Sequence, residues 1–540
     1  MCMTKVNELL VWNNLKQYSD EMNTPAKHLK NLIKEPDRLK NFCIKDGGIL
    51  FDFSRQRVDK KVMELLFELA EKTDVQKKFS DMAKGAIVNT TEKRAALHTA
   101  TRSSSNEPLF VDGIDIIPEM NRVKKEFKEF SEKIHSGEIK GSAGKPFKHI
   151  VVIGIGGSYL GAEFVSTALC SYADKGINIH YLANVDIHDF GRIASQIDPE
   201  TTLWLVISKS YTTAETTANT VQAYEFMKSK GLDPSKHFAT VTSKGSPGDD
   251  PSNPVLSAFH MFDFIGGRYS VTSAVGGVPL SIYFGYDKFE RFLKGAEEMD
   301  IHANTAPIDK NLPLISALIG IWNNDFLGYK AQGIIPYASP LSKLAPHVQQ
   351  LYMESNGKLA TKDGKLIDVD TGVIIFGEPG TNAQHSFFQL AHQGKPFPID
   401  FIGVINPQYN QYKSMSKGVT NHQELWANLI AQPMALAEGK DSEDKAKFFP
   451  GNRPSSTILL NDLSPESIGR ILSFYEARTV YEAFIWDLNP FDQFGVELGK
   501  KLASSIRKQM EEKNKNADYK VSSIDPISEF YVNTLFNGSI

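Results

Sequence analysis

Short apolar runs alternate with segments of helix length through the middle of the chain, and this pattern restricts the fold more than any other feature. The first runs are IVVIG, INIHYLAN, TTLWLVIS and HFATVTS, and each is separated from the next by enough residues for a helix. Buried strands joined by helices are typical of a parallel sheet. The loop KGSPGDDPSNP at 244–254, rich in Gly, Pro and Asp, is expected to end this series.

A second series of apolar runs begins after about residue 310, with GIIPY, GVIIFG, DFIGVI and STILLND. The chain has 540 residues, more than one hydrophobic core usually holds, so we predict two α/β units. We expect a mainly helical region over 1–120, a first α/β domain over 121–285 and a second over 286–497. The remaining residues, 498–540, are expected to begin as a helix and then become irregular.

The composition narrows the class of protein and of partner. A net charge of −4 leaves no overall positive field for nucleic acid or an anionic membrane surface. No apolar stretch approaches the ~20 residues that a membrane-spanning helix needs. The chain contains only 3 cysteines, widely spaced, which favours a reducing compartment over a disulfide framework. We therefore expect a cytoplasmic protein without nucleic-acid or membrane partners.

The turn that follows the first strand, in HIVVIGIGGSYLGAEF at 149–164, is glycine-rich and leads into a helix. A dinucleotide fingerprint would need Gly or Ala where Tyr159 stands, and a P-loop would need a lysine that the turn lacks. Both interpretations therefore fail. Gly157 and Ser158 at a helix N-terminus are suited to an anion such as phosphate, but an ordinary tight turn explains the motif equally well.

A second strand-to-helix junction, WLVISKSYTTAETTANT, shifts the balance towards phosphate binding. It places several polar side chains directly after an apolar run: Ser208, Lys209, Ser210, Thr212 and Thr213. Because ligands bind at the carboxyl ends of parallel strands, we expect this junction and the glycine-rich turn to meet at one sheet edge. Ordinary capping of a helix by Ser or Thr would account for one of these hydroxyls but not for all of them.

Two further segments supply groups for acid-base chemistry. In FDFIGGRYSVTSAVGG, Gly267 precedes Arg268, so the backbone can bend closely around a ligand beside a permanently charged guanidinium. In HVQQLYMESNGKLA, Gln350 and Glu354 are four residues apart and share one face of a helix. Glu354 is a candidate base. A structural salt bridge for Arg268 and a surface position for Glu354 are the alternatives.

The last candidates lie in two separate segments. His385 follows the loop GEPGTN and begins an apolar helix, as expected of an imidazole held at a cleft, although a single His is more often structural. Gln493 and Lys500 lie seven residues apart in NPFDQFGVELGKKLA, close to two helical turns. Most lysines on helices are solvated, so Lys500 by itself is weak evidence for a functional site. No cluster of metal-ligand type accompanies His385, and we expect no metal site.

Taken together, these segments resemble the phosphoglucose isomerase family over most of the chain. The segments that carry the resemblance are GIGGSYLG, SKSYTTAET, FIGGRYSVTSAVGG, MESNGK, GEPGTNAQH and FIWDLNPFDQFGVELGK. The resemblance implies an α/β fold with two sugar-isomerase (SIS-type) domains, in which helices flank parallel sheets, plus a helical N-terminal region and a C-terminal arm. It also implies that the enzyme needs no cofactor and forms a homodimer whose active sites share residues across the interface.

The activity implied by the resemblance is the reversible isomerisation of glucose 6-phosphate and fructose 6-phosphate, a step of glycolysis and gluconeogenesis. The sugar ring opens and a proton then moves through a cis-enediolate intermediate. By matching motif, Glu354 would be the base and Arg268 would stabilise the enediolate, while His385 or Lys500 would assist ring opening. The implied substrate-binding residues are Gly157, Ser158, Ser208, Lys209, Ser210, Thr213, Gly267, Gln350 and Gln493.

Two alternatives remain open from the sequence. One is a phosphosugar isomerase that also accepts mannose 6-phosphate, because tolerance of an epimer depends on pocket shape. The other is a non-catalytic phosphosugar sensor built on the same domain. A sensor would need the hydroxyl cluster but neither Glu354 nor Lys500, and the chain shows no basic DNA-binding region. The presence of both residues therefore favours an enzyme.

Overall fold

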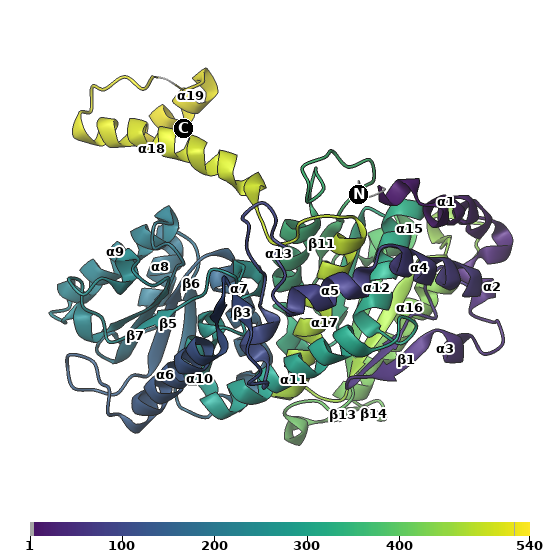
Figure 1. Ribbon diagram of the computed structural model, residues 1–540, viewed down its shortest axis with the longest axis horizontal. Helices are drawn as coiled ribbons and strands as arrows, with labels where there is room; N and C mark the ends of the chain where they lie inside the picture. The colour runs from purple at the N-terminus through teal and green to yellow at the C-terminus, as the bar shows by residue number, and fades with distance from the viewer. Residues whose placement is uncertain (1–4, 523) are drawn as a thin grey trace. The chain divides into compact units, whose positions relative to one another are not determined.

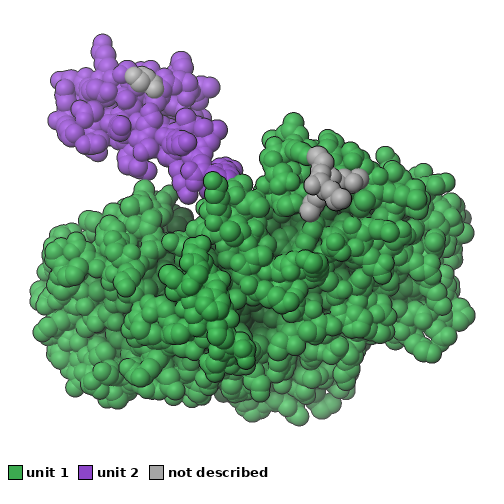
Figure 2. Space-filling model, in the orientation of Figure 1, with its two compact units in different colours: residues 1–491 green, residues 492–540 purple. Residues whose placement is uncertain are grey.

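The structure, a computed structural model, describes residues 5–522 and 524–540. It contains two compact units, residues 1–491 and residues 492–540, which Figure 2 distinguishes by colour. The first unit holds two separate sheets of mostly parallel strands, each with helices packed against it, and the second consists of helices (Figure 1). The α/β class predicted from the sequence is confirmed.

The first sheet has the strand order β6-β5-β7-β8-β9, and all of its strand pairs are parallel. Its strands are β5 (His149–Ile153), β6 (Asn178–Leu182), β7 (Thr202–Ile207), β8 (Phe238–Thr242) and β9 (Ala258–His260). The four predicted runs correspond to β5 through β8. The expectation that the loop at 244–254 ends the series is wrong, because β9 follows it and pairs with β8.

Alternate residues of β5 enter two different hydrophobic cores, which explains why the strand is apolar throughout. Ile150 and Val152 pack with α6 (Ile117–Ser136) and α10 (Ala274–Phe284). Val151 and Ile153 pack with residues of two other helices, α8 (Ile187–Ala194) and α9 (Ala214–Ser229). Helices thus cover both faces, as expected when every strand of a parallel sheet is buried on each side.

The second sheet has the order β1-β2-β15-β12-β10-β11. The predicted runs form β10 (Ala331–Pro336), β11 (Ile374–Phe376), β12 (Ile399–Val404) and β15 (Ser455–Leu460), which are parallel to one another. The sequence did not predict β1 (Cys43–Asp46) and β2 (Ile49–Asp52), an antiparallel pair that extends the sheet beside β15. The N-terminal region therefore contributes strands as well as helices such as α1 (Leu10–Met22), α4 (Lys60–Lys72) and α5 (Val75–Ala83).

A buried polar network fixes the helix that carries Glu354. Tyr352 on α13 (Leu344–Asn356) donates a hydrogen bond to Glu482 on α17 (Pro465–Ile485). Glu482 also pairs with Arg478 at 3.0 Å, and Arg478 reaches Asp400 of β12 at 3.1 Å. These charges are buried and mutually paired, which offsets the cost of removing them from water. The network ties α13 to α17 and to the second sheet.

The second unit contains α18 (Glu497–Lys515) and α19 (Pro526–Asn537). Asp525 caps α19 by accepting hydrogen bonds from the backbone N–H groups of Ile527 and Ser528. The predicted helix at the start of this segment is confirmed as α18. The expectation of an irregular tail is wrong, because α19 follows. In the described part of the chain, no helix is long and apolar enough to cross a membrane.

Candidate active site

Two strand-to-helix turns of the first sheet lie side by side, as the sequence predicted. Strands β5 and β7 are neighbours, with Ile153 opposite Val206 in the register. A Cβ placed on Gly154, just after β5, would lie 3.3 Å from the carbonyl oxygen of Ile207, the last residue of β7. The glycine-rich turn and the hydroxyl-rich loop therefore leave the same edge of the sheet, where ligands of parallel sheets bind.

The glycine-rich turn also interlocks with the turn that contains Arg268. A Cβ on Gly157 would lie 2.1 Å from the carbonyl carbon of Gly267 and 2.6 Å from the backbone nitrogen of Arg268. No side chain fits in that space, so glycine at position 157 is required by the close approach of two backbones. The approach brings Arg268 next to the end of β5.

The side chain of Arg268 is almost completely buried, at 1% exposed, and its guanidinium is held on several sides. Nε donates to the hydroxyl of Ser355 at 2.7 Å, and Nη2 donates to the carbonyl oxygen of Pro490 at 2.6 Å. Nη1 lies 3.5 Å from Oε2 of Glu354. The guanidinium thus has a fixed orientation beside the candidate base.

Glu354 and Gln350 lie on the same face of α13, as their spacing predicted. Gln350 Nε2 donates to Glu354 Oε2 at 3.0 Å, and the Glu354 side chain is 22% exposed, so the carboxylate is half-buried rather than a surface group. The same Nε2 would lie 3.0 Å from a Cβ on Gly156. In the described part of the chain, Gln350 Oε1 is buried without a hydrogen-bond partner. Gln350 therefore links the base to the glycine-rich turn and offers an acceptor.

The hydroxyl-rich loop between β7 and α9 is organised by its own side chains. The Ser208 hydroxyl accepts from the backbone N–H of Tyr211 at 3.1 Å, and Ser210 and Thr212 share a hydrogen bond of 2.7 Å. Tyr211 has a φ of +57°, which turns the chain sharply. Thr213 occupies the N-cap position of α9, but its side chain makes no capping hydrogen bond. Ordinary helix capping therefore does not explain Thr213.

Lys209 adds a positive charge to the same loop. Its ammonium group contacts both the carboxylate and the carbonyl oxygen of Asp263, each at 3.1 Å. Burial lowers the pKa of Lys209, and the positive charge of Arg94 lowers it further, while Asp263 opposes the shift. An anionic ligand beside this ammonium would favour its charged form. Lys209 and the adjacent hydroxyls make this loop suitable for a phosphate group.

The remaining candidates are His385, Gln493 and Lys500. The expectation that His385 begins an apolar helix is wrong, because His385 is the C-cap residue of α14 (Gly380–Gln384) and the next helix, α15 (Phe388–Gln393), starts after it. His385 is exposed. Gln493 and Lys500 belong to the second compact unit, where Gln493 precedes the short turn Phe494–Val496 and Lys500 lies in the first turns of α18. The first unit therefore brings together the glycine-rich turn, the hydroxyl-rich loop, Arg268, Gln350 and Glu354.

Sequence reasoning missed the groups that hold Arg268 in place. Ser355, which is fully buried, follows Glu354 directly, and Tyr269 follows Arg268 directly. Their hydroxyls lie 2.9 Å apart. Both residues lie inside candidate segments, MESNGK and FIGGRYSVTSAVGG. A buried serine and a buried tyrosine nevertheless give no periodic signal that separates an anchoring role from simple packing. The carbonyl of Pro490 carries no signal in its side chain at all.

The arrangement can perform one kind of chemistry well. A half-buried carboxylate beside a fixed guanidinium can accept a proton while the guanidinium stabilises negative charge that develops nearby. The hydroxyl-rich loop and Lys209 can bind an anion at the adjoining strand end. Among residues 5–522 and 524–540, no group of three or more His, Cys, Asp or Glu side chains is arranged to hold a metal ion.

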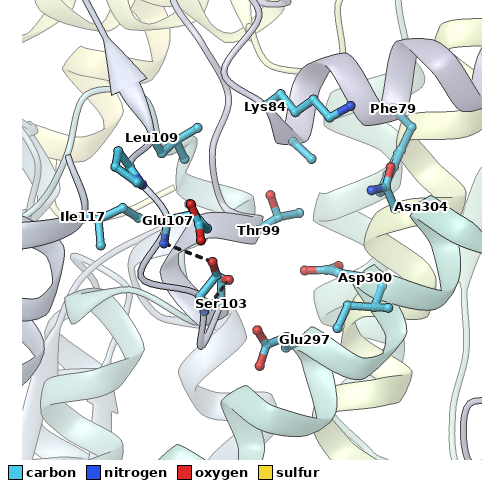
Figure 3. A pocket seen from close by; sticks show the side chains of 15 residues that line it. Phe79, Lys84, Thr99, Ser103, Glu107, Leu109, Ile117, Glu297, Asp300 and Asn304 are labelled. Carbon is cyan, nitrogen blue, oxygen red and sulfur yellow. Dashed lines mark hydrogen bonds between the residues drawn. The ribbon is translucent and has the colours of Figure 1, made fainter. Parts of the chain in front are cut away.

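A separate cavity of about 400 Å³ lies elsewhere in the first unit (Figure 3). Its lining includes the carboxylates of Glu107, Glu297 and Asp300, together with Thr99 and Asn304, and none of the candidate site residues. The lining carries charges of both signs, because Lys84 also contributes to it and the Arg102 guanidinium pairs with Asp300 at 2.6 Å. The cavity shares no residue with the candidate active site.

Comparisons with known proteins agree with this chemistry. The family model described as phosphoglucose isomerase matches residues 52–526. A glucose-6-phosphate isomerase from Desulfosudis oleivorans is 64% identical over 539 residues, covering 99% of each chain. A cytosolic glucose-6-phosphate isomerase from Spinacia oleracea is 43% identical over 94% of this chain and 92% of its own. The crystal structure of a glucose-6-phosphate isomerase from Chlamydia trachomatis is 36% identical, has a TM-score of 0.89 and covers 99% of this chain and 100% of its own.

Proposed function

Because the chain belongs to the phosphoglucose isomerase family, we propose that Glu354 and Arg268 are the pair that carries out its reaction. The protein catalyses the reversible isomerisation of glucose 6-phosphate and fructose 6-phosphate, a reaction of glycolysis and gluconeogenesis. The observation that carries the assignment of residues is the distance of 3.5 Å between the Glu354 carboxylate and the buried Arg268 guanidinium. Both groups lie at the carboxyl end of the first sheet.

The difficulty of the reaction explains why both groups are needed. The hydrogen on C2 of an opened aldose is barely acidic, so its removal requires a positioned base and stabilisation of the oxygens that become negative. Glu354 takes the proton from C2, the electrons move towards the C1 oxygen, and the resulting cis-enediolate lies against Arg268. Glu354 then returns the proton to C1, while the hydroxyl on C2 loses its proton to become the new carbonyl and the C1 oxygen gains one to become a hydroxyl. Base and guanidinium each contribute a factor of about 10² or more.

The phosphate is bound away from the reacting carbons, and this positions them. Ser158, Ser208, Ser210 and Thr213 supply hydroxyls, and Lys209 supplies positive charge, at the ends of two adjacent strands. Gly157, Gly267, Gln350 and Gln493 line the sugar. Binding energy from the phosphate is thereby converted into orientation of C1 and C2 relative to Glu354. No metal or cofactor enters this scheme.

Ring opening and assembly of the complete site form the second part of the proposal. His385 assists ring opening, with Lys500 as the other candidate for proton transfer to the ring oxygen. The exposed position of His385 in a single chain supports a homodimer in which active sites share residues across the interface. Exposed apolar side chains on α18 and α19, including Leu502 and Phe530, support the same arrangement. A cytoplasmic location follows the cytosolic relatives from plants.

Two alternative functions are not favoured. A non-catalytic sensor would have no use for a carboxylate placed against a guanidinium at the ligand-binding edge. A broader isomerase that also converts mannose 6-phosphate has no support among the relatives, whose names specify glucose 6-phosphate. Incubation with mannose 6-phosphate, followed by a search for fructose 6-phosphate, distinguishes the broader enzyme from the narrower one.

The proposal is tested by Glu354→Gln, which keeps the size of the side chain and removes its basicity. We expect turnover to fall by at least about 10²-fold while sugar-phosphate affinity stays the same, because the phosphate is held elsewhere. Turnover is measured by a coupled assay and affinity by calorimetry. Glu64→Gln, at a side chain that is 67% exposed on α4, is the matched control and should behave as wild type. Wild-type turnover in Glu354→Gln would refute the assignment of the base.

A further inference from the structure

We infer that Ser355 is a positioning residue, whose hydroxyl holds the Arg268 guanidinium beside Glu354 and keeps the two charged groups from closing into a tight ion pair. The inference rests on the proposed function and adds a residue to it. Ser355 does not reach the sugar in this scheme; it acts through Arg268. The argument comes from the contacts of all three side chains.

The Ser355 hydroxyl lies at the centre of a buried cluster. It accepts a hydrogen bond from Arg268 Nε at 2.7 Å and shares a second hydrogen bond of 2.9 Å with the Tyr269 hydroxyl. Ser355 is fully buried and Tyr269 is 1% exposed, so water does not compete for these bonds. A hydrogen bond to a charged donor in such surroundings is shorter and stronger than one between neutral groups. The orientation of the guanidinium therefore depends strongly on this hydroxyl.

The hydrogen bond from Arg268 Nε to Ser355 occupies one of the two donors that a side-on pair with a carboxylate requires. Side-on bidentate pairing with a carboxylate uses Nε and one Nη together. In this structure Nε is bonded to Ser355 and Nη2 to the carbonyl oxygen of Pro490. The contact with Glu354 is made by Nη1, at 3.5 Å, which is longer than an ordinary hydrogen bond. Arg268 is thus near Glu354 without being tightly bound to it.

This separation matters for the reaction. A carboxylate in a bidentate pair with arginine has its lone pairs occupied and is a poorer base, and the guanidinium in that pair is turned away from a developing enediolate. Ser355 immediately follows Glu354 on α13, so the helix itself sets the spacing between the base and the anchor of the cation. The same turn of α13 therefore positions the Glu354 carboxylate and, through Ser355, the Arg268 guanidinium.

The test begins with Ser355→Ala in the full-length protein. We expect kcat to fall about 10- to 100-fold, the range for loss of a hydrogen bond to a charged group, with KM unchanged because the phosphate contacts are intact. Ser281→Ala is the matched control: Ser281 is fully buried on α10, and its hydroxyl has no hydrogen-bond partner in the described part of the chain. This control should keep wild-type kcat.

A double-mutant cycle with Arg268→Lys separates positioning from a purely structural effect. Lysine lacks the Nε–H that Ser355 binds, so Ser355→Ala should cost nothing further in the Arg268→Lys background. Ser355→Cys, which replaces the hydroxyl by a thiol of similar size that is a weak acceptor, should reduce kcat in the Arg268 background and not in the Arg268→Lys background. This variant carries the test if Ser355→Ala does not fold.

Three results would overturn the inference: a wild-type kcat for Ser355→Ala, an effect on KM alone, or the same fractional loss of kcat in both backgrounds. Glu354→Gln in the same assay distinguishes these failures from failure of the proposed function. If Glu354→Gln retains turnover, the proposed function fails. If it is inactive while Ser355→Ala matches wild type, only the role of Ser355 fails.

Discussion

At the scale of single residues, Arg268 connects the parts of the candidate site. Its backbone touches the glycine-rich turn at Gly157, and its side chain contacts Ser355, Pro490 and Glu354. A buried guanidinium is tolerated only when its donors are satisfied, and here the partners that satisfy them also fix its direction. The contacts that stabilise the buried Arg268 guanidinium therefore also orient it towards the proposed substrate site.

The hydroxyl-rich loop gives a prediction about affinity. Replacing Ser208 and Thr213 together by Ala removes two proposed phosphate ligands, and Thr213 makes no capping hydrogen bond whose loss would destabilise α9. We expect the affinity for the sugar phosphate to fall about 10-fold or more, since hydrogen bonds to a charged group are lost, while stability falls by only about 1 kcal/mol because Ser208 also loses the hydrogen bond that it accepts from the Tyr211 N–H. Calorimetric titration with fructose 6-phosphate measures the first quantity and thermal unfolding the second. Unchanged affinity would remove the loop from the phosphate site.

Some residues of the candidate site can be predicted from the sequence, and others cannot. Glu354 and Gln350 were predicted to share a helix face because four residues correspond to about one turn, and the hydrogen bond between them confirms it. The importance of Gly157 was suggested by its motif, but only the structure shows the backbone of Gly267 in the space a side chain would fill. Ser355 and Tyr269 could not be identified, because their role depends on contacts between segments distant in the chain.

At the scale of secondary-structure elements, the two glycine turns act as one unit. Gly157→Ala would place a methyl group 2.1 Å from the Gly267 carbonyl carbon, so the backbones must separate. We expect the free energy of unfolding to fall by about 1–3 kcal/mol and turnover to fall with it, because Arg268 moves. Gly191→Ala on α8 is the matched control, since a Cβ there meets nothing within 4 Å. Equal stability and turnover in both variants would contradict the interlocking of the turns.

The packing of α13 against α7 (Leu160–Ala168) gives a prediction about pH. His347 on α13 is buried, its ring is stacked 5.8 Å from Phe164 on α7, and both ring nitrogens lack hydrogen-bond partners in the described part of the chain. Burial lowers the pKa of His347 from 6.5 to about 4. The folded protein therefore keeps His347 neutral where the unfolded chain binds a proton. Stability is fully present above about pH 6.5 and is lost as the pH falls towards 4.

We expect His347 to account for about 2 kcal/mol of the loss in the free energy of unfolding between about pH 7 and pH 5. His347→Phe keeps the ring and removes the proton site, so the loss should shrink by that amount. Urea unfolding at the two pH values measures it. His188→Gln, at a side chain that is 89% exposed, is the control and should lose as much stability as wild type. If His347→Phe loses as much free energy of unfolding as wild type between the two pH values, His347 is not the source of the pH dependence.

The predicted elements and the missed ones differ in length and burial. The strands β5, β7 and β12 are buried on both faces, so each forms a continuous apolar run that predicts a strand. β1 and β2 have four residues each, and the burial of β1 gives no continuous apolar run. β9 has three residues and follows a loop rich in turn formers. Such short segments are fixed by pairing with a neighbouring strand, which a local pattern does not reveal.

At the scale of the whole molecule, both helices of the second unit expose large apolar side chains. Leu498 and Leu502 on α18 are 67% and 57% exposed, and Phe530 and Leu535 on α19 are 63% and 64% exposed. Side chains of this size gathered on two helices are typical of an association surface. This surface supports the proposed homodimer. The domain boundaries at 120, 285 and 497 remain predictions.

A charge placed on this surface tests the dimer. We expect the wild-type protein to have the mass of a dimer by light scattering. Leu502→Glu should dissociate on dilution and lose activity in parallel, because burying an unpaired carboxylate in an interface is costly. Asn514→Glu adds the same charge to an exposed position on a different side of α18 from Leu498 and Leu502, and should leave the mass and the activity unchanged. A fully active monomer at every concentration would contradict the proposal that active sites are shared.

The central claim is that Glu354 moves a proton between C2 and C1 of the opened sugar, and isomerisation in deuterated water tests it most directly. A proton held on a carboxylate exchanges with solvent, so the wild-type enzyme should introduce deuterium at C1 of fructose 6-phosphate or C2 of glucose 6-phosphate during turnover. Glu354→Gln should introduce none, although it still binds the sugar phosphate. Isomerisation by the wild type without any solvent label, or labelling by Glu354→Gln at the wild-type rate, would contradict the account.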